Sequence, residues 1–242
     1  MHQRQAALDL LDFMMRHITI LDNTFSSISD RSLIFDLDNT IFDENIFLYQ
    51  GYFRISHYIN SKYGVDANEV HNFLWTSFLN GSRSNLFNQM LEHFNLEESL
   101  SIETLLAVFR NVEHQELVIF KYFHNFLVRN VDFYVITNGN RVQQASKFMA
   151  LGLHKYPQCL DVIYAECFAL KPKADSYHFL LKNRVLNRPL YIGDSTIDEE
   201  FARNCNIDFL KINFERNNAG FINESSISFK LFTDDLFNKM YL

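Results

Sequence analysis

Two aspartates, Asp36 and Asp38, directly follow a short apolar run near the beginning of the chain. The run, residues 32–35, is typical of a buried parallel strand. Because strand side chains repeat every second residue, both carboxylates should point the same way from the carboxyl end of that strand. Ligands of open parallel sheets bind at this end. Two like charges that share one mouth need a cation, and Mg²⁺ readily takes carboxylate oxygens, so the pair predicts a magnesium site.

Three further groups of polar residues lie at or just after the ends of predicted strands. They are Thr137 with Asn138, then Lys171, then Asp194 with Asp198. The carboxyl ends of parallel strands meet at one edge of a sheet, so we expect these side chains to gather around the first pair. Together they supply a carboxylate nucleophile, a second carboxyl group, hydroxyl and amide donors, one cation and further acidic groups for a metal.

The elements that must position these residues alternate between strands and helices. Strands are predicted at residues 32–36, 131–136, 160–164, 189–192 and 207–212. Helices are predicted between them, near residues 112–128, 141–151, 173–184 and 197–204. This alternation predicts an α/β fold with a Rossmann-like, doubly wound parallel sheet of about five strands. The tail beyond residue 214 is polar and ends in an amphipathic stretch at 233–241.

A long helical block interrupts this alternation after the first strand. Its candidate helices cover residues 45–63, 66–80, 83–94 and 101–111. The block is too long for a loop, so we expect an inserted all-helical cap over residues 44–114. The α/β core would then comprise residues 31–43 and 115–242, and residues 1–30 would form an N-terminal extension with a helix at 2–22.

Composition narrows the classes of function. Hydrophobic residues make up 48% of the chain and charged residues 21%, which indicates a sizeable core. The net charge of −7 argues against a nucleic-acid partner. Charged residues in the N-terminal apolar stretch argue against a signal peptide, and no apolar run is long enough to span a membrane. The three cysteines lack zinc or redox spacing. We therefore expect a cytoplasmic protein without a membrane partner, whose oligomeric state is open, with a homodimer as one option.

Four motifs in this order resemble the haloacid dehalogenase (HAD) superfamily, whose members are mostly phosphotransferases. The resemblance runs from about Leu33 to Ile212 and rests on Phe35-Asp36-Leu37-Asp38-Asn39-Thr40, Val135-Ile136-Thr137-Asn138-Gly139, Lys171-Pro172 and Gly193-Asp194-Ser195-Thr196-Ile197-Asp198. Each motif alone is weak, but together, each at a strand end, they are specific. The helical block lies between the first two motifs, as in the subgroup whose cap follows the first strand. The Asn-Thr pair and the Thr-Asn-Gly run look closest to small-metabolite phosphatases, such as pyrimidine nucleotidases and N-acylneuraminate-9-phosphatases.

The resemblance implies an Mg²⁺-dependent phosphatase that hydrolyses a small phosphorylated metabolite, either a sugar phosphate or a nucleoside monophosphate. Asp36 would attack phosphorus and form an aspartyl-phosphate. Asp38 would protonate the leaving oxygen and then accept a proton from the hydrolytic water. Mg²⁺ would bind the Asp36 carboxylate, the Asp38 backbone carbonyl and Asp194, with Asp198 as an auxiliary ligand.

The same resemblance implies the residues that hold the substrate. Thr137 and Lys171 would bind the phosphoryl oxygens, and Lys171 would also offset the carboxylate charge. Thr40, Asn138 and Gly139 would contribute further substrate contacts around the phosphoryl group.

Alternatives remain within and beyond the family. The family's dehalogenases and phosphonatases lack an Asp at the position of Asp38, which favours phosphate-ester transfer. A phosphomutase of the β-phosphoglucomutase type is still an alternative, because residues 79–84 resemble a cap segment in which an arginine contacts the second phosphate. In that case Arg83 would reach the substrate, whereas the simpler interpretation makes it a surface arginine at a helix start. The third alternative is a non-catalytic binding or regulatory module that retains the fold.

Overall fold

The computed structural model describes residues 30–81, 83–110 and 117–233. The helix predicted at 2–22 and nearly all of the amphipathic stretch at 233–241 lie outside these residues.

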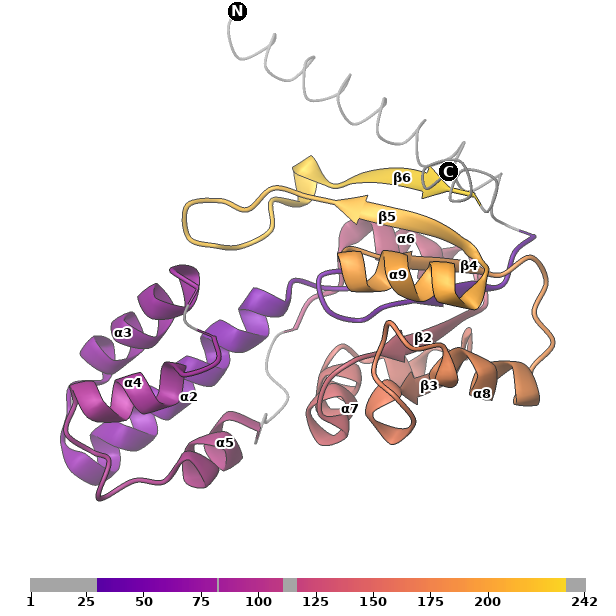
Figure 1. The fold of residues 1–242 in the computed structure, drawn as a ribbon. Coiled ribbons are helices and arrows are strands. Elements are labelled where there is room, and N and C mark those ends of the chain that lie inside the picture. Colours follow the sequence, from indigo (N-terminus) through magenta and orange to yellow (C-terminus); the bar gives the residue numbers. More distant parts are fainter. Residues whose placement is uncertain (1–29, 82, 111–116, 234–242) are drawn as a thin grey trace, which may run out of the picture.

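The core of the described chain is a six-stranded sheet with the order β3-β2-β1-β4-β5-β6 (Figure 1). Its strands are β1 (Leu33–Phe35), β2 (Phe133–Thr137), β3 (Cys159–Tyr164), β4 (Leu190–Gly193), β5 (Asp208–Asn213) and β6 (Ser228–Phe232). The first five run parallel, and β6 pairs antiparallel with β5. The predicted doubly wound parallel sheet is therefore confirmed. The sequence did not predict β6, a mostly exposed edge strand without a clear apolar alternation.

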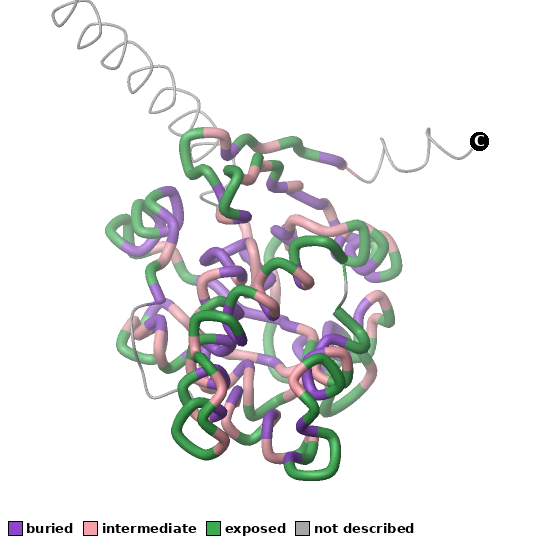
Figure 2. The backbone as a smooth tube through the Cα atoms, turned by 90° about the vertical axis from the view of Figure 1, so that its left-hand side faces the viewer, coloured by how far each residue is buried: buried purple, intermediate pink, exposed green. Residues whose placement is uncertain are grey.

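Helices cover both faces of the sheet. On one face, α6 (Lys121–Val128) and α7 (Arg141–Ala150) pack on side chains such as Phe35, whose ring lies 5.1 Å from that of Phe123 in an edge-to-face pair. On the other face, α8 (Asp175–Asn183) and α9 (Thr196–Cys205) enclose a second cluster around Ile34 and Tyr191. Neighbouring residues of β1 thus enter opposite clusters, as strand geometry requires. Figure 2 shows buried backbone concentrated in the middle of the molecule and exposed backbone at its outer turns.

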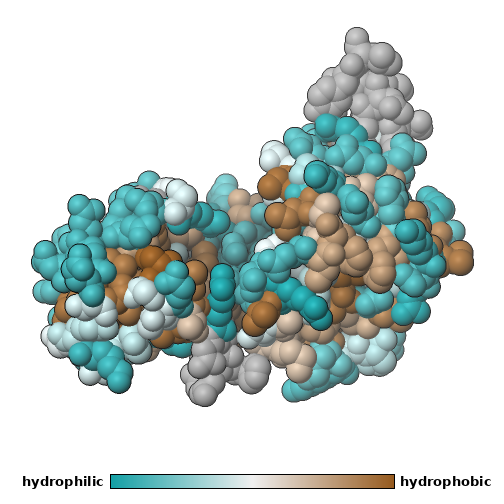
Figure 3. Space-filling model, turned by 60° about the horizontal axis from the view of Figure 1, so that its bottom comes forward, coloured by the Kyte–Doolittle hydropathy of each residue, from teal (hydrophilic) through white to brown (hydrophobic). Residues whose placement is uncertain are grey.

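The first four described helices after β1 form the cap, and α6 follows them before β2: α2 (Glu44–Tyr63), α3 (Ala67–Leu79), α4 (Leu86–His93) and α5 (Ile102–Arg110). The Asp43 side chain caps the start of α2, and Gly64 in the left-handed conformation ends it. Figure 3 shows the cap and the core as two lobes with a hollow between them. Within the described residues, no helix combines the length and apolar character that a membrane span needs.

A long connection between β5 and β6, residues 214–227, leaves the sheet and extends towards α2 and α3 (Figure 1). Ring contacts of Phe221 with Tyr49 of α2 and Trp75 of α3 connect it to the cap.

Candidate active site

A cavity of about 170 Å³ opens at the carboxyl ends of β1, β2 and β4. Its lining includes most of the residues that the sequence singled out: Asp36, Asp38, Thr137, Asn138, Lys171, Asp194 and Asp198. The strands deliver these residues to one place because all three run in the same direction. Residues more than 150 positions apart in the sequence thus form a single site.

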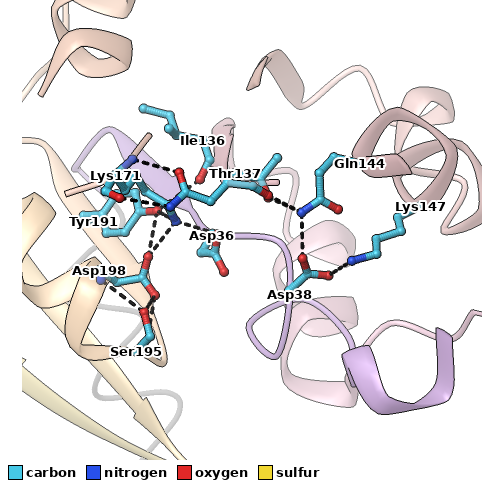
Figure 4. A network of polar contacts seen from close by, with 11 residues as sticks. Asp36, Asp38, Ile136, Thr137, Gln144, Lys147, Lys171, Tyr191, Ser195 and Asp198 are labelled. Atoms are coloured by element: carbon cyan, nitrogen blue, oxygen red, sulfur yellow. Dashed lines mark hydrogen bonds and ion pairs between the residues drawn. The ribbon is translucent and has the colours of Figure 1, made fainter. Parts of the chain in front are cut away.

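Lys171 and Asp36 form the centre of the site (Figure 4). Asp36 directly follows β1, and its backbone N–H donates to the Ile192 carbonyl at 2.8 Å. The Lys171 Nζ lies 2.7 Å from Asp36 Oδ1, 2.7 Å from the Tyr191 hydroxyl and 2.6 Å from Asp198 Oδ1. An ammonium group has three protons, and these three oxygens account for all of them. The cation is therefore fixed beside the predicted nucleophile.

The Asn138 side chain holds the backbone of Lys171 in place. Its Oδ1 accepts from the Lys171 N–H at 2.8 Å, and its Nδ2 donates to the Lys171 carbonyl at 3.1 Å. The amide therefore links the end of β2 to the residue that carries the cation. Both polar atoms of the Asn138 side chain thus bind the Lys171 backbone. The predicted contact between Asn138 and substrate stays a prediction.

Both carboxylate oxygens of Asp198 have protein donors. Oδ1 accepts from Lys171, and Oδ2 accepts from the Ser195 hydroxyl at 2.6 Å and its N–H at 3.1 Å. Although burial raises the pKa of Asp198, Lys171 and Ser195 lower it below its usual value overall. A Cβ on Gly193 would lie 2.6 Å from Asp198 Cγ, so this approach requires glycine at the end of β4.

The acidic side chains of the cavity fit a divalent cation. Oxygens of Asp36, Asp194 and Asp198 all lie within 4.8 Å of one another. Burial raises the pKa of Asp36 well above its usual value, and burial together with Asp198 raises that of Asp194 to about 7. Burial is the main cause of both shifts, so without a metal ion these two carboxyl groups favour the protonated form, and the single Lys171 ammonium group does not offset this effect. An oxygen-only donor set of this kind suits Mg²⁺, which Asp36 and Asp194 would hold, with Asp198 fixed beside them.

Two residues that the sequence analysis missed hold the second aspartate. The Asp38 carboxylate accepts from Gln144 Nε2 at 2.7 Å and from Lys147 Nζ at 2.6 Å, both on α7 (Figure 4). Gln144 also donates to Thr137 Oγ1 at 3.0 Å. The available signal was their spacing, since residues three apart on the helix that follows the Thr-Asn-Gly run share one face.

Lys147 also connects the core to the cap. Its side chain is only 1% exposed, and its Nζ lies 3.3 Å from Glu44 Oε1, at the first residue of α2. The ammonium group also lies 4.7 Å from the centre of the Phe47 ring. Burial, then the nearby Asp38, raises the pKa of Glu44, while Lys147 lowers it. One buried cation thus contacts the predicted acid–base residue and the start of the cap.

Three predicted substrate contacts lie outside the cavity lining. Thr40 is fully buried, and its carbonyl accepts from the Tyr122 hydroxyl. Gly139 has φ +105°, and a Cβ there would lie 3.1 Å from Gln144 Nε2. The Arg83 side chain is 62% exposed on the cap, 4.0 Å from Glu44 Oε2. Direct substrate contact by these three residues stays a prediction.

Comparison with known proteins places this site in a family. Residues 33–212 match the family model of the haloacid dehalogenase-like hydrolases. The chain belongs to this family. The matched stretch begins with β1 and ends in β5, so it spans the cap and every strand end that contributes to the cavity. Among curated proteins, no match was found.

Solved structures of HAD proteins share the fold. A candidate β-phosphoglucomutase from Thermotoga maritima has a TM-score of 0.58 and 18% identity, over 78% of this chain and 91% of that one. A candidate HAD-hydrolase from Bacillus subtilis with bound magnesium has a TM-score of 0.50 and 19% identity, over 74% and 86%. An L-2-haloacid dehalogenase from Xanthobacter autotrophicus with covalently bound chloropropionic acid has a TM-score of 0.50 and 14% identity, over 78% and 80%. The likeness to all three is one of fold.

Proposed function

We propose that this HAD hydrolase is an Mg²⁺-dependent phosphatase, which cleaves a small phosphate monoester through an aspartyl-phosphate intermediate. The proposal rests on the different partners of the two aspartates that line the cavity. Asp36 is paired with Lys171, whereas Asp38 is held separately by Gln144 and Lys147. Two carboxylates in different surroundings can serve as nucleophile and as acid–base group, and an alkoxide leaving group needs that second carboxyl group.

In the first half-reaction, a carboxylate oxygen of Asp36 attacks phosphorus in line with the ester oxygen. The bond from phosphorus to that oxygen breaks, and Asp38 supplies the proton that turns the leaving group into an alcohol. Lys171 and Thr137 lie at the cavity wall, where they can balance the charge on the phosphoryl oxygens. Because Lys171 also contacts Asp198, its ammonium group stays in position when Asp36 becomes esterified.

In the second half-reaction, water attacks the phosphorus of the aspartyl-phosphate and gives its proton to Asp38. The bond between phosphorus and the Asp36 oxygen breaks, which releases inorganic phosphate and restores both carboxyl groups. Gln144 and Lys147 keep Asp38 at the edge of the cavity through both steps.

The Asp36 and Asp194 carboxylates, with the Asp38 backbone carbonyl, would hold the metal ion. When bound, Mg²⁺ supplies positive charge against the phosphoryl oxygens and the clustered carboxylates. Asp198 supports the arrangement through Lys171 and Ser195.

A phosphate-release assay tests the proposal. The purified protein with Mg²⁺ is incubated with p-nitrophenyl phosphate, acetyl phosphate, sugar phosphates and nucleoside monophosphates. We expect release of phosphate that is abolished in Asp36→Asn, strongly reduced in Asp38→Asn and unchanged in Asp132→Asn, an exposed aspartate before β2.

Other outcomes would replace the proposal by a specific alternative. Isomerisation of a hexose 1-phosphate without net phosphate release identifies a mutase. Chloride release from 2-chloropropionate without phosphatase activity identifies a dehalogenase. Metal binding without turnover of any ester in the panel identifies a binding module.

A further inference from the structure

The β5–β6 connection is longer than a hairpin requires. Residues 214–227 lie between β5, which ends at Asn213, and β6, which begins at Ser228. Antiparallel neighbours are usually joined by about two to five residues. We call residues 214–227 the strap, because the extra length reaches across the gap between core and cap (Figure 1).

The tip of the strap has a defined turn. The Asn217 backbone N–H donates to the Phe221 carbonyl at 2.8 Å, and the Gly220 N–H donates to the Asn217 carbonyl at 2.9 Å. The Asn217 side chain also accepts from the Phe221 N–H at 3.1 Å. These bonds give the tip a fixed shape before any contact with the cap is counted.

The tip fits closely against the cap. The Phe221 ring is stacked on that of Trp75, with 5.4 Å between centroids, and meets Tyr49 edge-on at 5.6 Å. Gly220 has φ +87°, which favours glycine, and a Cβ there would lie 2.4 Å from a methyl carbon of Leu79, which would have to move. The contacts therefore involve both α2 and α3.

Arg216, at the base of the strap, binds residues 36–43 between β1 and α2, which we call the hinge of the cap. Its guanidinium group donates to Asp43 Oδ1 at 2.9 Å and to Asn39 Oδ1 at 2.9 Å. Asp43 is buried, caps α2 and accepts from the Ile222 N–H at 2.7 Å. Asn39 has φ +55° and lines the candidate active site. Arg216 therefore connects the strap to the first helix of the cap and to the loop that carries both catalytic aspartates.

A third contact lies between base and tip. The Asn45 side chain, in the first turn of α2, donates to the Gly220 carbonyl at 2.6 Å, and Arg216 donates to the same carbonyl at 2.9 Å. The carbonyl of one tip residue is thus shared by the cap helix and by the arginine of the strap. The hinge, the first turn of α2 and the aromatic face of the cap are held by one segment.

From these contacts we infer that the strap sets the angle between the cap and the core. The strap acts through Arg216, which is a positioning residue for the candidate active site. The inference rests on the proposed function in one respect, namely that the cap covers a phosphate ester during turnover. Release of the strap would let the cap open further, so that substrate binds more weakly and water enters the site more readily.

Trp75 is the single tryptophan of the chain. Its fluorescence therefore reports whether the strap covers the cap, independently of any enzymatic activity. Phe221 covers its ring directly, whereas Arg216 contacts the hinge instead. The experiment measures acrylamide quenching of Trp75 fluorescence in the full-length wild type, Arg216→Ala, Arg216→Lys and Asn218→Ala. Asn218 is an exposed residue of the same strap and is the matched control. Far-UV circular dichroism checks that each variant is folded.

We expect the quenching constant of Arg216→Ala to rise about twofold as the tip leaves the cap, while Asn218→Ala matches the wild type. Arg216→Lys should lie between them, because one ammonium group restores the charge at Asp43 without the planar fork. With p-nitrophenyl phosphate, Arg216→Ala should raise KM about tenfold and change kcat less, because the strap acts on closure rather than on the reacting atoms.

Three outcomes separate this inference from the proposed function. Unchanged quenching in folded Arg216→Ala overturns the inference that Arg216 keeps the strap on the cap. Increased quenching with unchanged KM and kcat overturns the positioning role. If no ester is hydrolysed by the wild type, the proposed function fails, but the quenching comparison still supports or overturns the strap.

Discussion

At the scale of residues, the buried Lys147 offers a direct test of the site. Its ammonium group is the cation between Asp38 and Glu44, and its side chain is 1% exposed. In Lys147→Met, two neighbouring carboxylates lose that cation, and breaking a buried pair typically costs about 3–5 kcal/mol. We predict a loss of this order in the free energy of unfolding, measured by urea denaturation, and a kcat lower by about 10-fold or more. Lys182→Met, at an exposed lysine of α8, is the control. A variant within about 0.5 kcal/mol of the wild type contradicts the prediction.

The pKa of Asp194 predicts a pH-dependent metal affinity. Burial raises that pKa to about 7 in the metal-free site. Below this pH a proton occupies the Asp194 carboxyl group, and above it the carboxylate is free to bind, so the affinity for Mg²⁺ should rise through about pH 7; it should not level off there, because burial raises the pKa of Asp36, the other carboxylate of the proposed metal site, as well. Thermal unfolding with and without Mg²⁺ should therefore show a larger stabilisation at about pH 8 than at about pH 6. Asp194→Asn should abolish most of the stabilisation at both values. Equal stabilisation of the wild type at both values contradicts the assignment of Asp194 as a ligand.

The sequence predicted the residues of the site whose position follows from strand geometry. Asp36, Thr137 and Asp194 each stand at or just after a strand end, and parallel strands bring such residues to one edge. It did not predict Gln144 or Lys147, because a helix face is recognised as functional only when its three-dimensional neighbour is known. For the same reason, the partner of Asn138 was not foreseen.

At the scale of elements, the packing of α2 on α5 depends on one glycine. A Cβ on Gly51 would lie 2.3 Å from a ring carbon of Phe109. Gly51→Ala should therefore destabilise the protein by about 1–3 kcal/mol through overpacking, even though alanine favours a helix more than glycine does. Urea denaturation measures the change. The double variant Gly51→Ala with Phe109→Leu should recover part of the loss, since the smaller side chain makes room. A Gly51→Ala protein that is more stable than the wild type would contradict the prediction, because it would show that α5 can move away from α2 without loss of stability.

The elements themselves were largely predictable. Polar breaks located the cap helices and short apolar runs located the five parallel strands, with boundaries within a few residues of those observed for α2 and β4. The short edge strand β6 carries no such pattern, because most of its side chains are exposed. The sequence analysis interpreted the strap as part of a polar tail. Its contacts are with cap residues far away in the sequence, and sequence patterns do not reveal such contacts.

At the scale of the whole molecule, the two lobes and the net charge should restrict which phosphate esters react. The cavity of about 170 Å³ has room for a phosphoryl group, and Lys147 links Asp38 of its lining to Glu44 at the start of the cap. The net charge of −7 also repels polyanions at a distance. Both features favour a small ester over a phosphate group carried by a polymer.

We therefore predict that a 5′-phosphorylated oligonucleotide is hydrolysed with a kcat/KM at least about 100-fold below that of the corresponding nucleoside monophosphate. Added salt should narrow this gap only in part, because it screens the repulsion of charges but leaves the cap in place. Phosphate release from both substrates at low and at physiological ionic strength measures the two contributions separately. If the oligonucleotide reacts as fast as the mononucleotide, the cap does not limit access and a small metabolite is not the preferred substrate. If salt removes the whole difference, charge alone selects the substrate, and the two-lobed shape has no part in the choice.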